Sequence, residues 1–138
     1  MTGRYPDSFY RISLKAIIRN EKGEVLLVKE NGDGWSFPGG GMSHGENVET
    51  SLARELYEEV LIDMPFTSCI IGTDVHYIPE YEAWLLWIIH ELTFPNGYTY
   101  GKGVDADEVA FVDALDLKDS ADIFERLVYK WSIKKSPH

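Results

Sequence analysis

The chain has 138 residues, of which 44% are hydrophobic and 13% aromatic, and these values favour one globular domain over a disordered chain. The formal net charge of −10 argues against binding to long nucleic acid or to an anionic membrane surface. The single cysteine, Cys69, excludes an internal disulfide bond and is typical of a reducing compartment.

The sequence carries no recognisable export or membrane segment. Residues 1–6 lack the apolar core of a signal peptide. The longest apolar run, residues 83–89, is too short to cross a bilayer. We therefore expect a cytoplasmic protein without a membrane partner.

The first third of the chain alternates between strand patterns and turn residues. From Tyr10 to Ile18 polar and apolar residues alternate, which predicts a strand with one wet face. A stretch rich in Val and Leu follows a turn that ends at Gly23, so we expect the two strands to form a hairpin. In chain order we predict a short mobile lead-in (1–8), a strand (10–18), a turn (20–23), a strand (24–29), a turn (31–34) and a short extended segment (35–38).

Residues 39–62 carry the features around which we expect the rest of the chain to be organised. Apolar residues recur every four positions from Val48 to Val60, which predicts a helix with one buried stripe. Beside this stripe three glutamates fall within about a third of the helix circumference, at roughly 100° per residue; they are Glu55, Glu58 and Glu59. Carboxylates so close together repel one another unless a cation lies between them, and a divalent ion with oxygen ligands suits that place. Taken alone, three such glutamates are more often a solvated helix face than a metal site, and the glycine turn and Arg54 at their spacing reverse that interpretation.

A glycine run, Gly39 to Gly41, precedes this helix and predicts a turn where backbone groups approach a ligand closely. His44 follows in the same loop, where it could contact a phosphate or simply be exposed. A glycine turn that leads into a helix with clustered carboxylates favours metal-assisted chemistry on a phosphate compound.

The remaining elements complete one α/β domain. In chain order we predict strands at 66–71 and 73–77 separated by Gly72, an exposed turn (79–82), a central strand (81–92), a Tyr-rich loop (95–103), a last strand (108–113) and a helix after Asp119. Lysines near the end of that helix suit the negative end of its dipole.

The spacing in the central stretch closely resembles the signature of the Nudix hydrolases. Gly40 is followed after five residues by Glu46 and, after seven more, by Arg-Glu-Leu-Tyr-Glu-Glu-Val-Leu-Ile at residues 54–62. The family pattern is Gly, five residues, Glu, seven residues, then Arg-Glu, an apolar residue, any residue, Glu-Glu, any residue, Gly and an apolar residue. Six fixed positions match at fixed spacing, which makes the signal far more specific than a short glycine motif.

One signature position differs, because Leu61 stands where the family has glycine. We interpret that glycine as a left-handed helix cap, a conformation that costs a non-glycine residue about 1 kcal/mol. Either Leu61 tolerates this strain or the helix ends differently.

The resemblance implies a Nudix-type α/β/α sandwich with a mixed β-sheet between helices, and hydrolysis of a nucleoside diphosphate linked to another moiety. It implies Mg²⁺ or Mn²⁺ held by Glu55, Glu58, Glu59 and the carbonyl of Gly40. Glu58, Glu59, Arg54 and Glu46 would be the catalytic group, with Arg54 orienting a signature glutamate and Glu46 as its partner. Gly39, Gly41 and His44 would lie at the substrate.

The sequence leaves the general base open. Hydrolysis of a pyrophosphate needs charge neutralisation on its oxygens and a deprotonated water, and a carboxylate accepts or relays the proton. A signature glutamate could act as this base. So could Asp105, Asp107 or Glu108, which precede the predicted last strand.

Three readings of the whole chain follow. The favoured one is a pyrophosphohydrolase acting on a small nucleotide-like diphosphate. A second is a Nudix-fold domain that binds a nucleotide without cleaving it, although such a domain would be expected to lose signature glutamates that this chain keeps. A third is a domain whose acidic helix binds a cation for stability only, which leaves Gly40 and Arg54 unexplained. The resemblance also suggests a homodimer.

Overall fold

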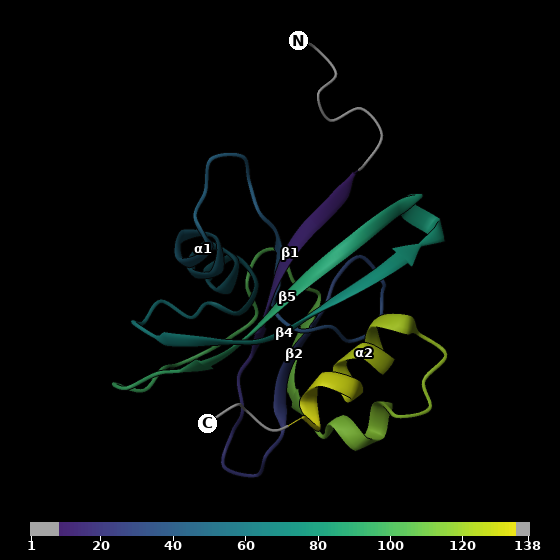
Figure 1. Ribbon diagram of the computed structural model, residues 1–138. Helices are drawn as coiled ribbons and strands as arrows, with labels where there is room; N and C mark the ends of the chain where they lie inside the picture. Colours follow the sequence, from purple (N-terminus) through teal and green to yellow (C-terminus); the bar gives the residue numbers. More distant parts are fainter. Residues whose placement is uncertain (1–8, 135–138) are drawn as a thin grey trace.

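The structure is a computed structural model that describes residues 9–134, so the expected lead-in over residues 1–8 lies outside the described part. A four-stranded sheet forms its centre (Figure 1). Its strands in spatial order are β3 (Gly39–Gly41), β1 (Tyr10–Ile17), β5 (Ala83–Thr93) and β4 (Thr67–Ile78). The β1–β5 pair is parallel and the other two pairs are antiparallel, so the sheet is mixed as expected.

Two helices cover opposite faces of this sheet, α1 (Val48–Val60) and α2 (Ile123–Ser132) (Figure 1). The alternation of β1 divides the core between them. Leu14 and Ala16 pack in one cluster with the apolar stripe of α1, whereas Ile17 packs in a second cluster with Val128 and Trp131 of α2. The expected α/β/α sandwich is therefore confirmed.

A separate two-stranded sheet consists of β2 (Val25–Lys29) and β6 (Glu108–Val112). Four successive residues of β2, from Val25 to Val28, are buried, and they contribute alternately to the two core clusters. A strand with both faces covered reads as a continuous apolar run. Short 3₁₀ helices lie at Pro79–Tyr81 (η1) and Ala114–Leu117 (η2).

The expected hairpin of the first two strands is limited to the residues beside its turn, where Asn20 N donates to Glu24 O at 3.0 Å. β1 and β2 lie in different sheets, joined by a single bridge between Arg19 and Val25 and by a hydrogen bond of 2.9 Å from Leu26 N to Ile18 O. Because β2 buries both faces, it pairs with β6 between the two core clusters and does not extend the larger sheet.

The two strands expected on either side of Gly72 are one strand. β4 runs through this position with a register shift between Ile70 and Gly72, which is a β-bulge. Gly72 is required by close packing, since a Cβ atom there would overlap the indole ring of Trp131. The glycine marks a contact with α2 and no break in the strand.

Helix α1 begins and ends at recognisable caps. The side chain of Asn47 accepts a hydrogen bond of 2.8 Å from the backbone of Thr50, the usual N-cap arrangement. At the other end Leu61 has φ 55° and ψ 29°, and its amide donates to Tyr57 O at 3.2 Å while Ile62 donates to Leu56 O at 3.3 Å. The left-handed cap is therefore kept, and Leu61 takes the strained conformation.

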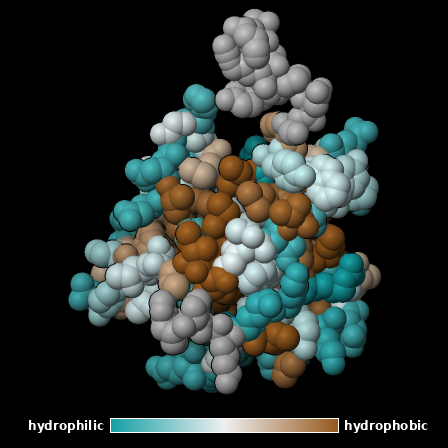
Figure 2. All heavy atoms as spheres, viewed as in Figure 1, coloured by the Kyte–Doolittle hydropathy of each residue, from teal (hydrophilic) through white to brown (hydrophobic). Residues whose placement is uncertain are grey.

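The α1 side of the sheet is only partly covered. Figure 2 shows apolar side chains at the surface over the strands between the two helices. Exposed large residues on this side include Ile70, Val75 and Tyr77 of β4 and Trp84 of β5. Within residues 9–134, no helix combines the length and apolar character that crossing a membrane requires.

Candidate active site

The glycine run forms the short strand β3 rather than the expected turn. It pairs with Leu14 and its neighbours in β1, and a Cβ atom at Gly39 would overlap the carbonyl of Leu14. Gly39 also has φ +129°, a conformation that favours glycine. The extended backbone brings the Gly39 amide to Glu59, where it donates a hydrogen bond of 2.6 Å to Oε1. A Cβ atom at Gly40 would lie 2.8 Å from Oε1 of Glu55.

Arg54 lies at the centre of the signature carboxylates. Its Nε and Nη2 atoms donate to the two oxygens of Glu46 at 2.7 and 2.9 Å, a two-pronged pairing typical of strong ion pairs. Its Nη1 atom donates to Glu58 at 2.8 Å and to Glu55 at 3.2 Å. The expected pairing of Arg54 with Glu46 is present, and one guanidinium holds three of the four glutamates.

The four glutamates differ in their electrostatic environments. Hydrogen bonds from Arg54, with one from the Ser43 amide, lower the pKa of Glu46 to about 2. Burial raises the pKa of Glu55, and the charge of Arg54 opposes this shift. Glu59 is 3% exposed, and burial together with the neighbouring Glu30 carboxyl raises its pKa far above the ordinary range. The negative charge of this cluster therefore depends on cationic partners.

A polar cavity of about 540 Å³ opens onto these glutamates. Its wall includes Glu55, Glu58 and Glu59 from α1, together with Asp105 and Asp107 from the loop before β6. Glu108 is exposed at the first position of β6 and His44 is exposed in the loop before α1, and neither is part of the wall. The structure thus brings two of the three candidate bases to the signature glutamates and leaves Glu108 and His44 outside.

The loop that carries Asp105 is bound to the end of α1. The amides of Gly101, Gly103 and Asp105 donate to the carbonyls of Val60, Glu59 and Glu58 at 2.9, 2.9 and 3.1 Å. A Cβ atom at Gly103 would overlap the carbonyl of Glu58. The last carbonyls of a helix have no hydrogen-bond donor within the helix. Here the amides of this loop are the donors.

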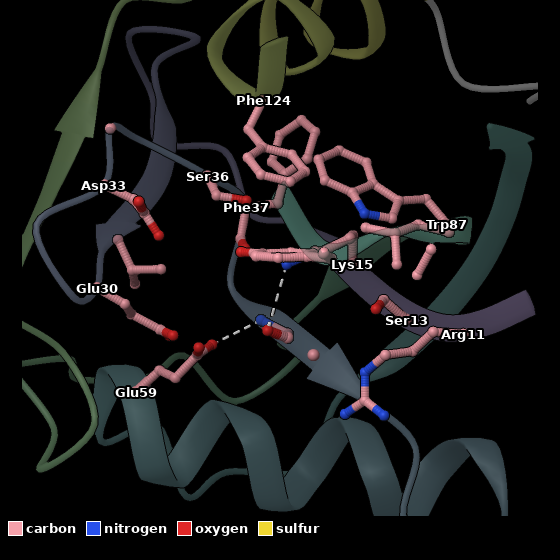
Figure 3. Close-up of a pocket in the computed structure, with 17 residues that line it drawn as sticks. Arg11, Ser13, Lys15, Glu30, Asp33, Ser36, Phe37, Glu59, Trp87 and Phe124 are labelled. Atoms are coloured by element: carbon pink, nitrogen blue, oxygen red, sulfur yellow. Dashed lines mark hydrogen bonds between the residues drawn. The ribbon is translucent and has the colours of Figure 1, made fainter. Parts of the chain in front are cut away.

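A second cavity, of about 530 Å³, adjoins the first and shares Arg11, Glu30 and Glu59 with it (Figure 3). Three aromatic side chains form one end of it: Phe37, Trp87 and Phe124. Phe124 and Trp87 are stacked, with ring centroids 5.7 Å apart. Aromatic walls next to a polar cavity suit a ligand that has both a flat apolar part and a charged part.

Lys15 extends across the floor of this aromatic cavity (Figure 3). Its Nζ atom lies 3.4 Å from the carbonyls of Phe37 and Gly39 and 5.2 Å from the centroid of the Trp87 ring. Burial lowers its pKa, and the charges of Glu59 and Glu30 oppose the shift. Among residues 9–134, no carboxylate lies within salt-bridge distance of Lys15.

Sequence reasoning missed the polar residues that β1 and the loop after β2 contribute to this second cavity, whereas Gly39, Gly40 and Glu59, which also line it, belong to the signature stretch. Arg11, Ser13 and Lys15 alternate along β1 and form the wet face that the pattern predicted, but that face lines a cavity and not the outer surface. The available signal was three polar residues in alternate positions of an otherwise apolar strand. Glu30 and Asp33 follow β2; Asp33 lies in the turn predicted at 31–34, and no role was predicted for Glu30.

The donors in the polar cavity have the chemistry that Mg²⁺ or Mn²⁺ prefers, namely carboxylate and carbonyl oxygens. Glu55, Glu58 and Glu59 would hold such an ion, and the bare backbone of Gly40 leaves room beside Glu55. Within residues 9–134, no three acidic or histidine side chains already converge on one point. In this structure Arg54 donates hydrogen bonds to Glu55 and Glu58, and the Gly39 amide donates one to Glu59.

Comparison with known proteins assigns this architecture to a family. The model of the NUDIX domain matches residues 9–131, and the chain therefore belongs to the Nudix family. The MutT protein of Methanosarcina mazei has a similar structure, with a TM-score of 0.72 at 24% identity over 91% of this chain and 94% of that protein. The NUDIX domain of NrtR from Shewanella oneidensis, solved in complex with ADP ribose, superposes with a TM-score of 0.68 at 16% identity, over 91% of this chain and 86% of that one.

Among curated proteins, the chain is similar to the RNA pyrophosphohydrolase of Actinobacillus pleuropneumoniae. The two are 50% identical over 52 residues, which make up 37% of this chain and 25% of the relative. The chain thus matches only about a quarter of that relative's length.

Proposed function

We propose that the protein is a metal-dependent pyrophosphohydrolase that cleaves a small nucleotide-like diphosphate. The observation that carries this proposal is the junction of the two cavities. A cavity with three signature glutamates meets an aromatic cavity at Arg11, Glu30 and Glu59. A ligand that spans this junction would place its diphosphate at the glutamates and its organic part against Phe37, Trp87 and Phe124.

The roles of the protein groups follow from this placement. Arg11 and Lys15 have no carboxylate within salt-bridge distance among residues 9–134, so their charges are free to attract phosphate oxygens. Arg54 holds Glu46 and restrains Glu55 and Glu58 through its hydrogen bonds. When bound, Mg²⁺ or Mn²⁺ supplies charge neutralisation on the diphosphate and a lower pKa for the attacking water. Asp105 lies on the same cavity wall and is our first choice for the carboxylate that accepts the water proton.

The substrate is expected to be small. A chain with a net charge of −10 is repelled by a long polyphosphate backbone, and the aromatic cavity of about 530 Å³ has the size of a nucleoside-sized pocket. The expected cytoplasmic location rests on the sequence, whose single cysteine suits a reducing compartment.

The test is release of phosphate or pyrophosphate products from a panel of nucleoside triphosphates, dinucleoside polyphosphates, nucleotide sugars, ADP-ribose and an RNA with a 5′-triphosphate. Each substrate is incubated with Mg²⁺, with Mn²⁺ and with a chelator. We expect metal-dependent release from at least one small substrate, and this result also names the substrate class.

Two other outcomes would contradict the proposal. Release from the RNA alone would replace the small substrate with an RNA end. If no substrate is cleaved but a nucleotide raises the melting temperature, the chain is a nucleotide-binding Nudix domain, the alternative that the sequence leaves open.

A further inference from the structure

Helix α2 contributes to the wall of the aromatic cavity, and two carboxylates outside that wall attach it to the rest of the chain. Near its start, Glu125 accepts a hydrogen bond of 2.8 Å from the amide of Trp35. At its end, Lys130 and Trp131 each donate a hydrogen bond of 2.8 Å to Oδ2 of Asp74 on β4. The position of this wall therefore depends on groups that the cavity itself does not contain.

Asp74 lies beside the aromatic wall. It is the cross-strand partner of Trp87 in the β4–β5 ladder, and it is 8% exposed. Burial opposes ionisation of its carboxyl, but the hydrogen bonds from Lys130 and Trp131 lower its pKa. Asp74 is therefore a buried charge, and a buried charge is costly unless its hydrogen-bond donors stay in place. Movement of α2 away from β4 would leave this carboxylate without them.

His76, two residues further along β4, connects Asp74 to the rings of the cavity wall. Its Nδ1 atom lies within hydrogen-bonding distance of Oδ1 of Asp74, at 3.3 Å. The imidazole meets the rings of Trp87 and Phe124 edge to face, with centroid distances of 5.1 and 6.1 Å, an arrangement in which aromatic rings attract one another. The two wall rings are themselves stacked, with 11° between their planes (Figure 3). The three rings thus form one packed group that contacts Asp74 through the imidazole.

We propose that Asp74 is a positioning residue, which holds Phe124 against Trp87 and thereby sets the affinity for the organic part of the substrate. It acts through its hydrogen bonds to α2 and through the imidazole of His76. The inference rests on the function proposed above, which places this part of the substrate in the aromatic cavity. Asp74 lines neither cavity, so its replacement leaves the signature glutamates in place. Contacts that bind substrate and transition state equally change KM and not kcat.

The test compares the steady-state kinetics of Asp74→Leu and Asp74→Asn with those of the wild type, on each compound of the panel above that the wild type hydrolyses with Mg²⁺. Asp74→Leu removes the acceptor of both α2 hydrogen bonds, and we expect KM to rise about 10-fold while kcat stays within about 3-fold. Asp74→Asn keeps an acceptor oxygen, so its KM is expected to rise only about 3-fold. Leu92→Ala is the control, because Leu92 is buried in the core cluster that contains the stripe of α1. It is expected to lower the melting temperature and to leave KM unchanged.

Hydrogen exchange followed by mass spectrometry shows whether the effect acts through α2. We expect the amides of α2 to exchange faster in Asp74→Leu than in the wild type, and those of α1 to exchange equally in both. If Asp74→Leu does not fold, Asp74→Asn serves for both measurements.

Three results would overturn this inference while the wild type still hydrolyses a substrate. They are a KM that does not change in the variants of Asp74, a kcat that falls further than KM rises, and a rise in KM of Leu92→Ala as large as that of Asp74→Leu. The last result would mean that KM follows stability and not the position of α2. A wild type that hydrolyses no compound of the panel would instead contradict the proposed function, and this inference with it.

Discussion

The backbone amide of Gly39 lies 2.6 Å from Oε1 of Glu59 and donates a hydrogen bond to it. This bond joins the strand β3 to the last turn of α1, two segments that the family signature separates by a loop. It fixes Glu59 at the boundary of the two cavities, where its side chain is 3% exposed. The position of Glu59 thus depends on backbone geometry that only glycine permits at residue 39.

Glutamine at position 58 or 59 is expected to abolish most of the turnover. Glu58→Gln and Glu59→Gln remove a carboxylate while keeping the shape of the side chain, and we expect kcat to fall by about 10²–10⁴-fold. In Glu59→Gln the side-chain amide oxygen can still accept the Gly39 hydrogen bond, so the melting temperature should stay within a few degrees. Product release with Mg²⁺ and thermal melts measure the two effects.

The control for these variants is Glu49→Gln, which changes an exposed glutamate in the first turn of the same helix. It is expected to leave kcat unchanged. Turnover near the wild-type rate in both Glu58→Gln and Glu59→Gln would remove these carboxylates from the reaction.

Asp105 and Glu108 allow a second test of the mechanism, in which a variant of Asp105 is compared with a control variant of Glu108. Asp105 lies on the wall of the polar cavity, whereas Glu108 is exposed outside it. We expect Asp105→Asn to lower kcat and to remove the acidic limb of the pH–rate profile, and Glu108→Gln to leave both unchanged. The measurement is kcat across the pH range at saturating metal. An unchanged profile in Asp105→Asn would shift attention to Asp107 or to a signature glutamate.

Replacement of Leu61 by glycine tests the strain at the end of α1. Leu61 has φ 55°, a left-handed conformation that costs a side chain with a Cβ atom about 1–2 kcal/mol. The greater freedom of glycine in the unfolded chain offsets part of this gain, so we expect Leu61→Gly to raise the free energy of unfolding by about 0.5–1 kcal/mol. Urea denaturation measures the change. Leu61→Ala keeps the strain, and a stabilisation as large as that of glycine in this variant would show that strain is not the cause.

The buried histidine of β5 makes stability depend on pH. His90 is 1% exposed, and within the described chain neither ring nitrogen has a hydrogen-bond partner. Burial lowers the pKa of His90 below its usual 6.5, so below about pH 6.5 the unfolded chain binds a proton that the folded chain does not. Above about pH 6.5 His90 therefore causes no loss of stability, and the free energy of unfolding decreases as the pH falls from 6.5 toward the lower folded pKa.

His90→Leu removes the titrating imidazole and, with it, the two ring nitrogens that lack hydrogen-bond partners. We expect it to stabilise the protein by about 1 kcal/mol at neutral pH, and by more at about pH 5 than at about pH 8. Urea denaturation at the two pH values measures both effects. His76 also has a lowered pKa because of burial, so some acid sensitivity should remain in the variant. An identical gain at both pH values would contradict the assignment.

Most elements could be predicted because their signals are local. The stripe from Val48 to Val60 predicted α1, and the alternation from Tyr10 predicted β1. The pairing of strands was harder, since nothing in the residues of β2 states that its partner is β6, which comes much later in the chain. Gly72 was misleading for the same reason: the ring of Trp131 that requires a glycine there comes from the far end of the chain.

The candidate site likewise combines residues that local sequence patterns reveal with residues that only the folded chain brings together. The signature glutamates and Arg54 lie within one helix and its preceding loop, so spacing alone was enough to select them. The aromatic cavity combines β1, the loop after β2, β5 and α2, and only the folded chain brings Lys15, Trp87 and Phe124 together. The aromatic cavity, which we propose holds the organic part of the substrate, is therefore the part of the site that a single sequence does not reveal.

The hydrogen bonds between residues 101–105 and the end of α1 have a consequence for hydrogen exchange. This loop has no regular secondary structure, yet the amides of Gly101, Gly103 and Asp105 each donate to a carbonyl of the helix. These three amides should exchange with deuterium as slowly as the helix amides, while the amides of the exposed residues Lys102 and Val104 exchange fast. If the pattern is found, the segment with Asp105 and the helix with the glutamates open and close as one unit.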